Sequence, residues 1–292
     1  MNIVQIHSGL GNQMFQYAFY LALRQYCPDT KIDASIFAHR PSHNGYELER
    51  IFALSAQYAS IEERNRLADV GKDWWTVLRH AIGWRRKTNG MTITEPDPAL
   101  GWREDLLHVE NAYLQGYWQT EKYFAQVADS VREEFTFRLP LSSVDEELAC
   151  EILSKNSVSV HIRRGDYLKE RRRADYEVCT ALYYRRAVEY IQSRVESPVF
   201  YVFSDEPEWG REQQIFPEGT VFVSGHTAEQ SYIDMQLMSM CHHHVIANSS
   251  FSWWGAWLGQ QDDTIVVAPS MWFRYRQRPD IIPENWIKID AE

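Results

Sequence analysis

The chain has 292 residues, a formal net charge of −10 and 11 tryptophans, 16 tyrosines and 13 phenylalanines. At about 100–200 residues per domain, this length predicts two domains or one large one. The acidic balance excludes a general nucleic-acid binder, and 45% apolar with 24% charged residues excludes a disordered chain. No apolar run reaches the roughly 18 residues of a membrane helix, and no signal-peptide pattern opens the sequence, so we expect a cytoplasmic protein.

The N-terminal half has the pattern of an α/β domain that ends in a linker. Residues 91–105 are expected to be loop because they carry Pro96, Pro98 and Gly101. The linker at 138–143 predicts two domains, 1–143 and 144–292. The expected elements are a strand at 2–7, a turn at 8–12, an aromatic-rich helix at 13–26, a strand at 31–33, helix and then basic residues at 60–90, a strand at 113–118 and a helix near 121–135.

The C-terminal half alternates strands and helices more regularly. Its strands are nearly continuous apolar runs, which is typical of a buried parallel sheet of Rossmann type. The fold class is therefore predicted as α/β, with two Rossmann-like domains facing across a cleft that suits a ligand. The expected strands are 157–163, 198–204, 220–223, 243–247 and 264–268, and the expected helices are 144–154, 179–193, 208–216, 228–241 and 251–258.

Polar residues follow the first of these strands at the end where parallel sheets bind ligands. Arg163 and Arg164 are followed by Gly165 and Asp166. Guanidinium groups bind phosphate oxygens with two parallel hydrogen bonds, and a glycine permits close approach, so this string suits a pyrophosphate. Asp166 could orient an arginine or act as a base. The alternative is a salt-bridged surface turn.

Two further strands end in comparable signals. Asn248, Ser249 and Ser250 predict a helix N-cap with free backbone N–H groups, which is either an anion site or an ordinary cap. Asp205 could bond a nucleobase or ribose, or cap the following helix. The histidines at 242–244 enter a strand, where alternate side chains face opposite ways, so no metal site is expected there.

The N-terminal loop matches two thirds of a dinucleotide-binding fingerprint. Gly9 and Gly11 are present and Asp33 lies near the place of the ribose-binding acid, but Met14 replaces the third glycine. Neither a phosphate loop of the GxxxxGK[ST] type nor an Asp-x-Asp pair occurs. Arginines and helix dipoles, rather than Mg²⁺, would then neutralise a departing pyrophosphate.

Four strings together resemble the motifs of the α-1,2-fucosyltransferase family, in the family's order. They are GLGNQMFQY at 9–17, HIRRGDY at 161–167, FSD at 203–205 and ANSSFSWWGA at 247–256. The resemblance extends from residue 3 to about residue 272. It implies a fold of the GT-B kind without an essential metal. It also implies inverting transfer of L-fucose from GDP-β-L-fucose to the 2-hydroxyl of a terminal galactose.

The resemblance also implies roles for individual residues. The base is the least defined role: Asp166 is the first candidate, Glu206 the second, and a phosphate oxygen of the donor could also accept the proton. By similarity, Arg163 and Arg164 hold the pyrophosphate and stabilise departing GDP, His161 and Asp205 lie at the guanosine end, Asn248, Ser249, Ser250 and Phe251 cap the phosphates, and Gly9, Gly11, Asn12 and Gln13 face the fucose and acceptor.

The implied partners are GDP-fucose and a galactose-terminated oligosaccharide or lipid-linked glycan, with no further cofactor. Because the chain starts at its first strand, it resembles a bacterial, cytosolic form that acts in O-antigen or capsule synthesis. The basic clusters at 171–173 and at Arg274, Arg276 and Arg278 could contact anionic lipid at the inner face of the plasma membrane, or could simply be solvated.

Two other classes of function stay open at this point. The glycine loop and Asp33 would suit a nucleotide-dependent oxidoreductase, and the aromatic content would suit a non-catalytic glycan-binding protein. Trp253 and Trp254 are expected to brace their helix. Four aromatic residues of the N-terminal half are expected to stack on an acceptor sugar: Trp102, Tyr113, Tyr117 and Trp118. The loops at 34–50 and 88–120 would select the acceptor, but no motif in them shows which galactoside is used.

Overall fold

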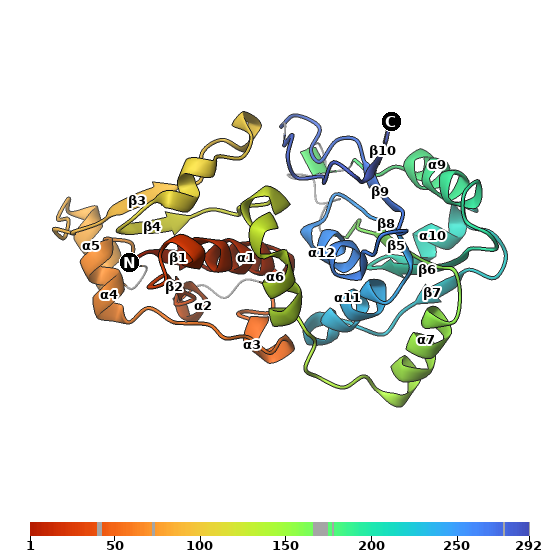
Figure 1. The fold of residues 1–292 in the computed structure, drawn as a ribbon, viewed down its shortest axis with the longest axis horizontal. Coiled ribbons are helices and arrows are strands. Elements are labelled where there is room, and N and C mark those ends of the chain that lie inside the picture. The colour runs from red at the N-terminus through yellow and green to blue at the C-terminus, as the bar shows by residue number, and fades with distance from the viewer. Residues whose placement is uncertain (40–42, 72–73, 166–174, 177, 277, 292) are drawn as a thin grey trace. The chain divides into compact units, whose positions relative to one another are not determined.

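A computed structural model describes residues 1–39, 43–71, 74–165, 175–176, 178–276 and 278–291. The chain divides into two compact units, Met1–Arg138 and Leu139–Glu292 (Figure 1). Each unit has its own parallel sheet with helices around it. The prediction of an α/β fold built from two parallel-stranded units is therefore confirmed.

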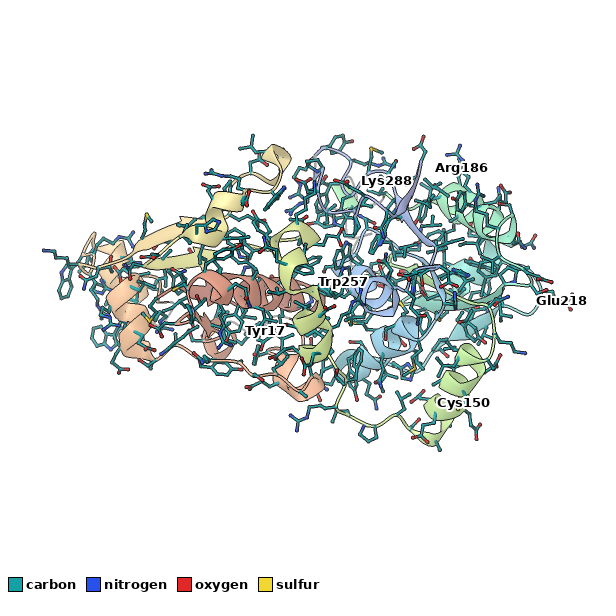
Figure 2. The ribbon with its side chains drawn as sticks, viewed as in Figure 1. Tyr17, Cys150, Arg186, Glu218, Trp257 and Lys288 are labelled. Atoms are coloured by element: carbon teal, nitrogen blue, oxygen red, sulfur yellow. The ribbon has the colours of Figure 1, made fainter. Side chains whose placement is uncertain are left out.

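Unit 1 contains a four-stranded sheet in the order β2-β1-β4-β3, and every neighbouring pair is parallel. Its long helix α1 is buried along most of its length, and aromatic and aliphatic residues occupy 11 of its 17 positions. Figure 2 shows Tyr17 of this helix in the interior of the unit. The elements are β1 (Ile3–Gln5), α1 (Leu10–Tyr26), β2 (Lys31–Asp33), α2 (Ile36–His39), α3 (Leu48–Ile51), α4 (Ile61–Leu67), α5 (Trp74–Ala81), β3 (Met91–Thr94), β4 (Ala112–Gln115) and α6 (Ala128–Glu134).

Unit 2 contains a six-stranded sheet in the order β10-β9-β8-β5-β6-β7, again parallel throughout. The residues of β5, β8 and β9 are all buried, as expected for strands with both faces covered. In Figure 2, Trp257 lies among the buried side chains of α12, whereas Arg186, Glu218 and Lys288 lie at the periphery. The elements are α7 (Ser143–Leu153), β5 (Ser157–Ile162), α9 (Ala181–Gln192), β6 (Val199–Ser204), α10 (Pro207–Glu212), β7 (Val221–Val223), α11 (Tyr232–Ser239), β8 (His243–Val245), α12 (Ser250–Gly259), β9 (Val266–Pro269) and β10 (Ile287–Ile289).

The order of the strands in unit 2 sets the place of a ligand. From β5 the chain builds outward through β6 and β7, and then returns to add β8, β9 and β10 on the other side. The direction of winding therefore reverses between β5 and β8. In open α/β sheets, ligands bind outside the carboxyl ends of the strands at such a reversal.

Three expectations about the elements are wrong. The segment 91–105 contains a strand, β3, which pairs with β4 at the edge of the sheet. Its β-branched residues were overlooked because prolines and a glycine follow them closely. The sheet of unit 2 has a sixth strand, β10, whose three residues are too few to show a pattern. Helix α1 begins at Leu10, so Gly11 and Asn12 lie in its first turn rather than before it.

Candidate functional site

The carboxyl end of β5 carries the two arginines, and a neighbouring carboxylate holds their backbone. Asp205, just after β6, accepts hydrogen bonds from the backbone N–H of Arg164 at 3.0 Å and of Gly165 at 3.1 Å. Its Oδ2 also lies 3.5 Å from Nη1 of Arg163. A Cβ at position 165 would lie only 2.8 Å from that oxygen, so a larger residue would push the Asp205 carboxylate away from these hydrogen bonds. Asp205 therefore fixes the turn from which both arginines project.

The Arg164 side chain is held from a second direction. Its Nε donates to Oε2 of Glu206 at 3.3 Å, and its guanidinium lies 4.2 Å from the centre of the Trp209 ring. A fork held by a carboxylate and an aromatic face has lost much of its rotational freedom, which lowers the cost of binding an anion. Glu206 itself is the N-cap residue of α10, so the alternative in which Asp205 caps that helix is wrong.

Helix α12 begins beside β5, and its first turn brings the third motif to the same edge. Ser249 is the N-cap residue, and its hydroxyl accepts a hydrogen bond from the Phe251 backbone N–H at 3.3 Å. The Phe251 ring lies 5.7 Å from the His161 ring. Ser250 opens the helix without an acidic residue in the first turn, so the positive end of the helix dipole is not neutralised there.

Asn248 is occupied by the fold. Its Nδ2 donates to the carbonyl oxygens of Tyr176 at 3.1 Å and Trp272 at 2.9 Å, and its Oδ1 accepts from the Cys179 thiol at 3.6 Å. The side chain therefore ties three segments together behind the helix start. This arrangement suits a residue that positions Ser249 and Ser250 better than one that contacts a ligand through its amide.

His161, the fifth residue of β5, is buried at the centre of this edge. Among the described residues its Nδ1 has no hydrogen-bond partner, although it is fully enclosed. Burial, assisted by the charge of Arg163, lowers the pKa of the imidazole to about 3. A neutral histidine with an unused ring nitrogen beside two arginines can bond a polar ligand group, since buried polar atoms are rarely left unpaired.

A second buried histidine allows the effect of such burial to be tested away from the site. His244 in β8 bonds Oγ of Ser159 through Nδ1 at 2.8 Å, and burial lowers its pKa to about 3. Between about pH 3 and the ordinary pKa of 6.5, His244 is protonated in the unfolded chain but neutral in the native state, so stability falls as the pH falls. We expect the free energy of unfolding to drop by about 1.4 kcal/mol per pH unit for each such imidazole. Urea unfolding at several pH values should show that the free energy of unfolding of His244→Gln changes less steeply with pH than that of the wild type. An equally steep pH dependence would contradict a lowered pKa of His244.

The three consecutive histidines do not act together. His242 pairs with Asp263 at 3.0 Å, Nδ1 of His243 accepts the Ile265 N–H at 3.1 Å, and His244 bonds Ser159. Within the described ranges, no three His, Cys, Asp or Glu side chains gather as metal ligands.

In unit 1, polar groups gather at the carboxyl ends of β1 and β4, where the winding of that sheet also reverses. Gln16 links the two ends: its Oε1 accepts the His7 N–H at 2.8 Å, and its Nε2 donates to the Gly116 carbonyl at 3.0 Å. The His7 ring bonds the Ser8 hydroxyl at 2.8 Å and meets the Tyr117 ring edge-on. Burial lowers the pKa of His7, so its imidazole is neutral at pH 7.

The predicted acceptor loop is a scaffold in this structure. Gln13 is buried; its Nε2 donates to the carbonyls of Ser8 and Gly45, both at 2.8 Å, and its Oε1 accepts the Glu47 N–H at 3.0 Å. Asn12 accepts from Nε2 of Gln119 at 2.6 Å. Gly9 is the N-cap residue of α1, and Gly11 is buried in its first turn.

His7 and Gln16 were missed by the sequence reasoning. The signal was available for His7, because it is the last residue of a predicted strand and therefore lies at the ligand-binding edge of a parallel sheet. Gln16 had no such signal, since a polar residue inside an aromatic helix shows its purpose only when its two partners are known.

Some predicted residues lie elsewhere. Tyr113 and Trp118 are fully buried, so the prediction that they stack on a sugar is wrong; Trp102 and Tyr117 keep partial exposure. Asp33 is buried and accepts the Tyr113 hydroxyl at 2.7 Å and the Ser35 N–H at 2.9 Å, so it is not available to a ribose. Trp253 and Trp254 are fully buried, which confirms that they brace their helix.

The remaining predictions concern the base and the basic clusters. Asp166 and residues 171–173 lie outside the described residues. Arg276 donates to Asp175 from Nε at 2.7 Å and lies 4.3 Å from the centre of the Phe273 ring, so it organises its own loop. No helix in the described part of the chain is long and apolar enough to cross a membrane.

Comparison with known proteins gives a consistent result. The sequence model of glycosyl transferase family 11 matches residues 105–290. An alpha-1,2-colitosyltransferase from Escherichia coli is 32% identical, with 99% of this chain and 98% of that protein covered. The O-antigen biosynthesis glycosyltransferase WbnK from Escherichia coli is 30% identical, with coverages of 97% and 99%.

An animal enzyme and a solved structure are also similar to this chain. Galactoside alpha-(1,2)-fucosyltransferase 1 from Leontocebus fuscicollis is 29% identical over 97% of this chain and 73% of its own length. Fucosyltransferase NodZ from Bradyrhizobium superposes with a TM-score of 0.49 at 13% identity, over 87% of this chain and 90% of its own. The full-length bacterial matches and the family model together show that this chain belongs to glycosyl transferase family 11, and hence that it is a glycosyltransferase.

Proposed function

We propose that the protein transfers L-fucose from GDP-β-L-fucose to the 2-hydroxyl of a terminal galactose, with inversion and without a metal, in O-antigen or capsule synthesis. One observation carries this proposal. Arg163 and Arg164 project from β5 at the reversal point of a parallel sheet, and Asp205 holds them beside the start of α12. The names of the relatives support parts of it: one is an alpha-1,2-colitosyltransferase, one an O-antigen biosynthesis glycosyltransferase and one a galactoside alpha-(1,2)-fucosyltransferase.

In this proposal unit 2 binds the donor. The arginines neutralise the charged diphosphate of the donor and the further negative charge that develops on it as GDP departs, and the start of α12 supplies further positive potential. Preorganised donors of this kind can serve where other enzymes place a divalent cation. Neutral His161, with its unused Nδ1, and Asp205 lie at the guanosine end.

Unit 1 would bind the acceptor. The reaction removes a proton from the galactose hydroxyl as the new bond forms, and Asp166 remains our first candidate for this base. Glu206 is a weaker candidate, since its carboxylate already orients Arg164. Full activity and an unchanged pH–rate profile in Asp166→Asn would exclude Asp166, and the proton would then go to a phosphate oxygen of the donor.

The decisive experiment is a transfer assay on defined sugars. We expect GDP-fucose and β1,3- or β1,4-linked galactosides to give an α1,2-linked product, at equal rates with EDTA or with Mg²⁺, as judged by NMR of the anomeric proton. A parallel assay with a colitosyl donor tests the sugar named for the first relative. Activity that requires Mg²⁺ would contradict the metal-independent mechanism. The absence of transfer to every galactoside tested would contradict the proposal that a terminal galactose is the acceptor.

The two alternatives have lost their support. An oxidoreductase would need Asp33 for its ribose, and that carboxylate is buried and bonded within the sheet. A glycan-binding protein without activity conflicts with membership of a glycosyltransferase family.

A further inference from the structure

Helix α5 in unit 1 is amphipathic, but its orientation is the reverse of that of a helix packed on a hydrophobic core. Its polar side faces the protein: Thr76 is buried, and Arg79 and His80 both bond the carboxylate of Asp69. Its apolar side faces solvent, with Trp74 and Trp75 each 63% exposed and Val77 and Leu78 each 46% exposed. A helix of a globular protein normally buries its apolar stripe against the core.

The chain after α5 extends this apolar face. Ile82 is 71% exposed and Trp84 is 67% exposed, and the exposed residues Arg85, Arg86 and Lys87 follow directly. We call the side chains of Trp74, Trp75, Val77, Leu78, Ile82, Trp84, Arg85, Arg86 and Lys87 the Trp/Arg surface. An exposed contiguous apolar patch of this kind is typical of an interaction site.

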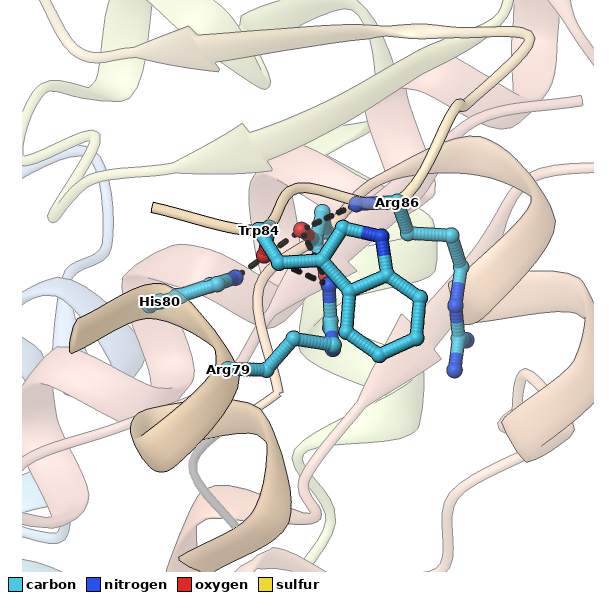
Figure 3. A network of polar contacts seen from close by, with 5 residues as sticks. Arg79, His80, Trp84 and Arg86 are labelled. Carbon is cyan, nitrogen blue, oxygen red and sulfur yellow. Dashed lines mark hydrogen bonds and ion pairs between the residues drawn. The ribbon is translucent and has the colours of Figure 1, made fainter. Parts of the chain in front are cut away.

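Asp69 holds this surface in place. Its carboxylate accepts from Nη2 of Arg79 at 2.6 Å, from Nε2 of His80 at 2.9 Å and from the Arg86 backbone N–H at 2.9 Å (Figure 3). Nη1 of Arg79 also donates to the Trp84 carbonyl at 3.2 Å. These bonds hold the pKa of Asp69 well below its usual range, so the ionised carboxylate persists at any physiological pH. The helix and the basic segment are thus fixed relative to each other, and both Trp84 and Arg86 stay exposed.

The charge of this segment is opposite to that of the chain. From Trp74 to Thr94 the sequence has no Asp or Glu, but it has Arg79, Arg85, Arg86 and Lys87, in a protein of net charge −10. Tryptophan favours the headgroup region of a bilayer, and basic residues beside it are attracted to anionic lipid. At about 1.5 Å per residue, eight helical residues extend about 12 Å, which suits a helix lying in the interface.

We propose that the Trp/Arg surface docks the enzyme on an anionic lipid bilayer. The indoles and aliphatic side chains would enter the boundary between headgroups and acyl chains, and the basic residues would contact the lipid phosphates. None of the residues of this surface belongs to the basic cluster of Arg274, Arg276 and Arg278 or to the strand ends that carry the proposed active site. It does not depend on which sugar the enzyme transfers.

The test is co-sedimentation of the full chain with vesicles. We expect binding to equimolar phosphatidylcholine and phosphatidylglycerol, but little to phosphatidylcholine alone. Replacing Arg85, Arg86 and Lys87 by Gln should weaken binding about 100-fold, since each basic residue near an anionic surface contributes about fivefold. Trp74→Ser with Trp75→Ser should abolish it. Matched controls are Arg185, Arg186 and Arg194 replaced by Gln, and Leu153→Ser, an exposed apolar residue on α7.

Transfer to a soluble galactoside separates this proposal from the proposed function. All variants should keep their circular dichroism spectrum and their rate on the soluble acceptor, because none of the changed residues belongs to the site. The proposal would be overturned if the wild type bound equally well to vesicles with and without phosphatidylglycerol. It would also be overturned if neither the variant with Gln at 85–87 nor the variant with Ser at 74 and 75 bound more weakly than the wild type. It would also be overturned if sedimentation velocity showed that the tryptophans hold two copies of the chain together and no vesicle is bound.

Discussion

Arg163→Ala is expected to lower kcat/KM for fucosyl transfer by about 100- to 1,000-fold, the usual loss when one preorganised charge-stabilising donor is removed. Arg163 projects from the turn that Asp205 holds at the carboxyl end of β5. Because negative charge builds up on the diphosphate between the bound donor and the transition state, kcat should fall more than the affinity for GDP-fucose. Steady-state kinetics, and calorimetry with GDP-fucose in the absence of an acceptor, both in EDTA, would separate the two effects.

The neighbouring residue provides a graded comparison. Arg164 is held by Glu206 and Trp209, so Arg164→Lys should lose the paired geometry while it keeps the charge, and should recover only part of the activity. Arg194→Ala, whose guanidinium lies over Tyr190 on α9, is the matched control and should retain full activity. Wild-type rates in Arg163→Ala or Arg164→Ala would remove the arginines from the proposed mechanism.

The sequence predicted this edge of the site well for a physical reason. Continuous apolar runs identify buried parallel strands, and the residues that follow such strands must share one edge of the sheet. Arg163, Asp205 and Ser249 could therefore be brought together without coordinates. The pattern could not reveal the separate roles of these residues. Asp205, for example, accepts hydrogen bonds from two backbone N–H groups.

Two kinds of feature could not be predicted. Short edge strands such as β3 and β10 have too few residues to show a period, and their pairing depends on the sheet that is already present. The burial of individual aromatic residues also depends on tertiary packing. Tyr117 and Trp118 are adjacent and both aromatic, yet Tyr117 is 37% exposed and Trp118 is fully buried.

This pair supplies the second large effect. Trp118→Ala is expected to lower the free energy of unfolding by about 3–5 kcal/mol, because it leaves a large cavity in the core of unit 1. The ring stacks on Phe19 at a centroid distance of 4.3 Å and meets Tyr123 edge-on. Tyr117→Ala should cost about 1 kcal/mol or less, since a partly exposed side chain loses little burial.

Trp118→Phe separates packing from sugar recognition. Among the described residues, the indole N–H of Trp118 has no hydrogen-bond partner, so its removal costs nothing in bonding, and phenylalanine keeps most of the stacking on Phe19. Urea unfolding should therefore place this variant within about 1.5 kcal/mol of the wild type. The acceptor KM provides an independent measurement. Because Trp118 is buried, this KM should stay constant in Trp118→Phe, whereas the exposed Tyr117 can contact a sugar and Tyr117→Ala can therefore raise it. A raised acceptor KM at unchanged stability in Trp118→Phe would instead mean that this ring reaches the sugar.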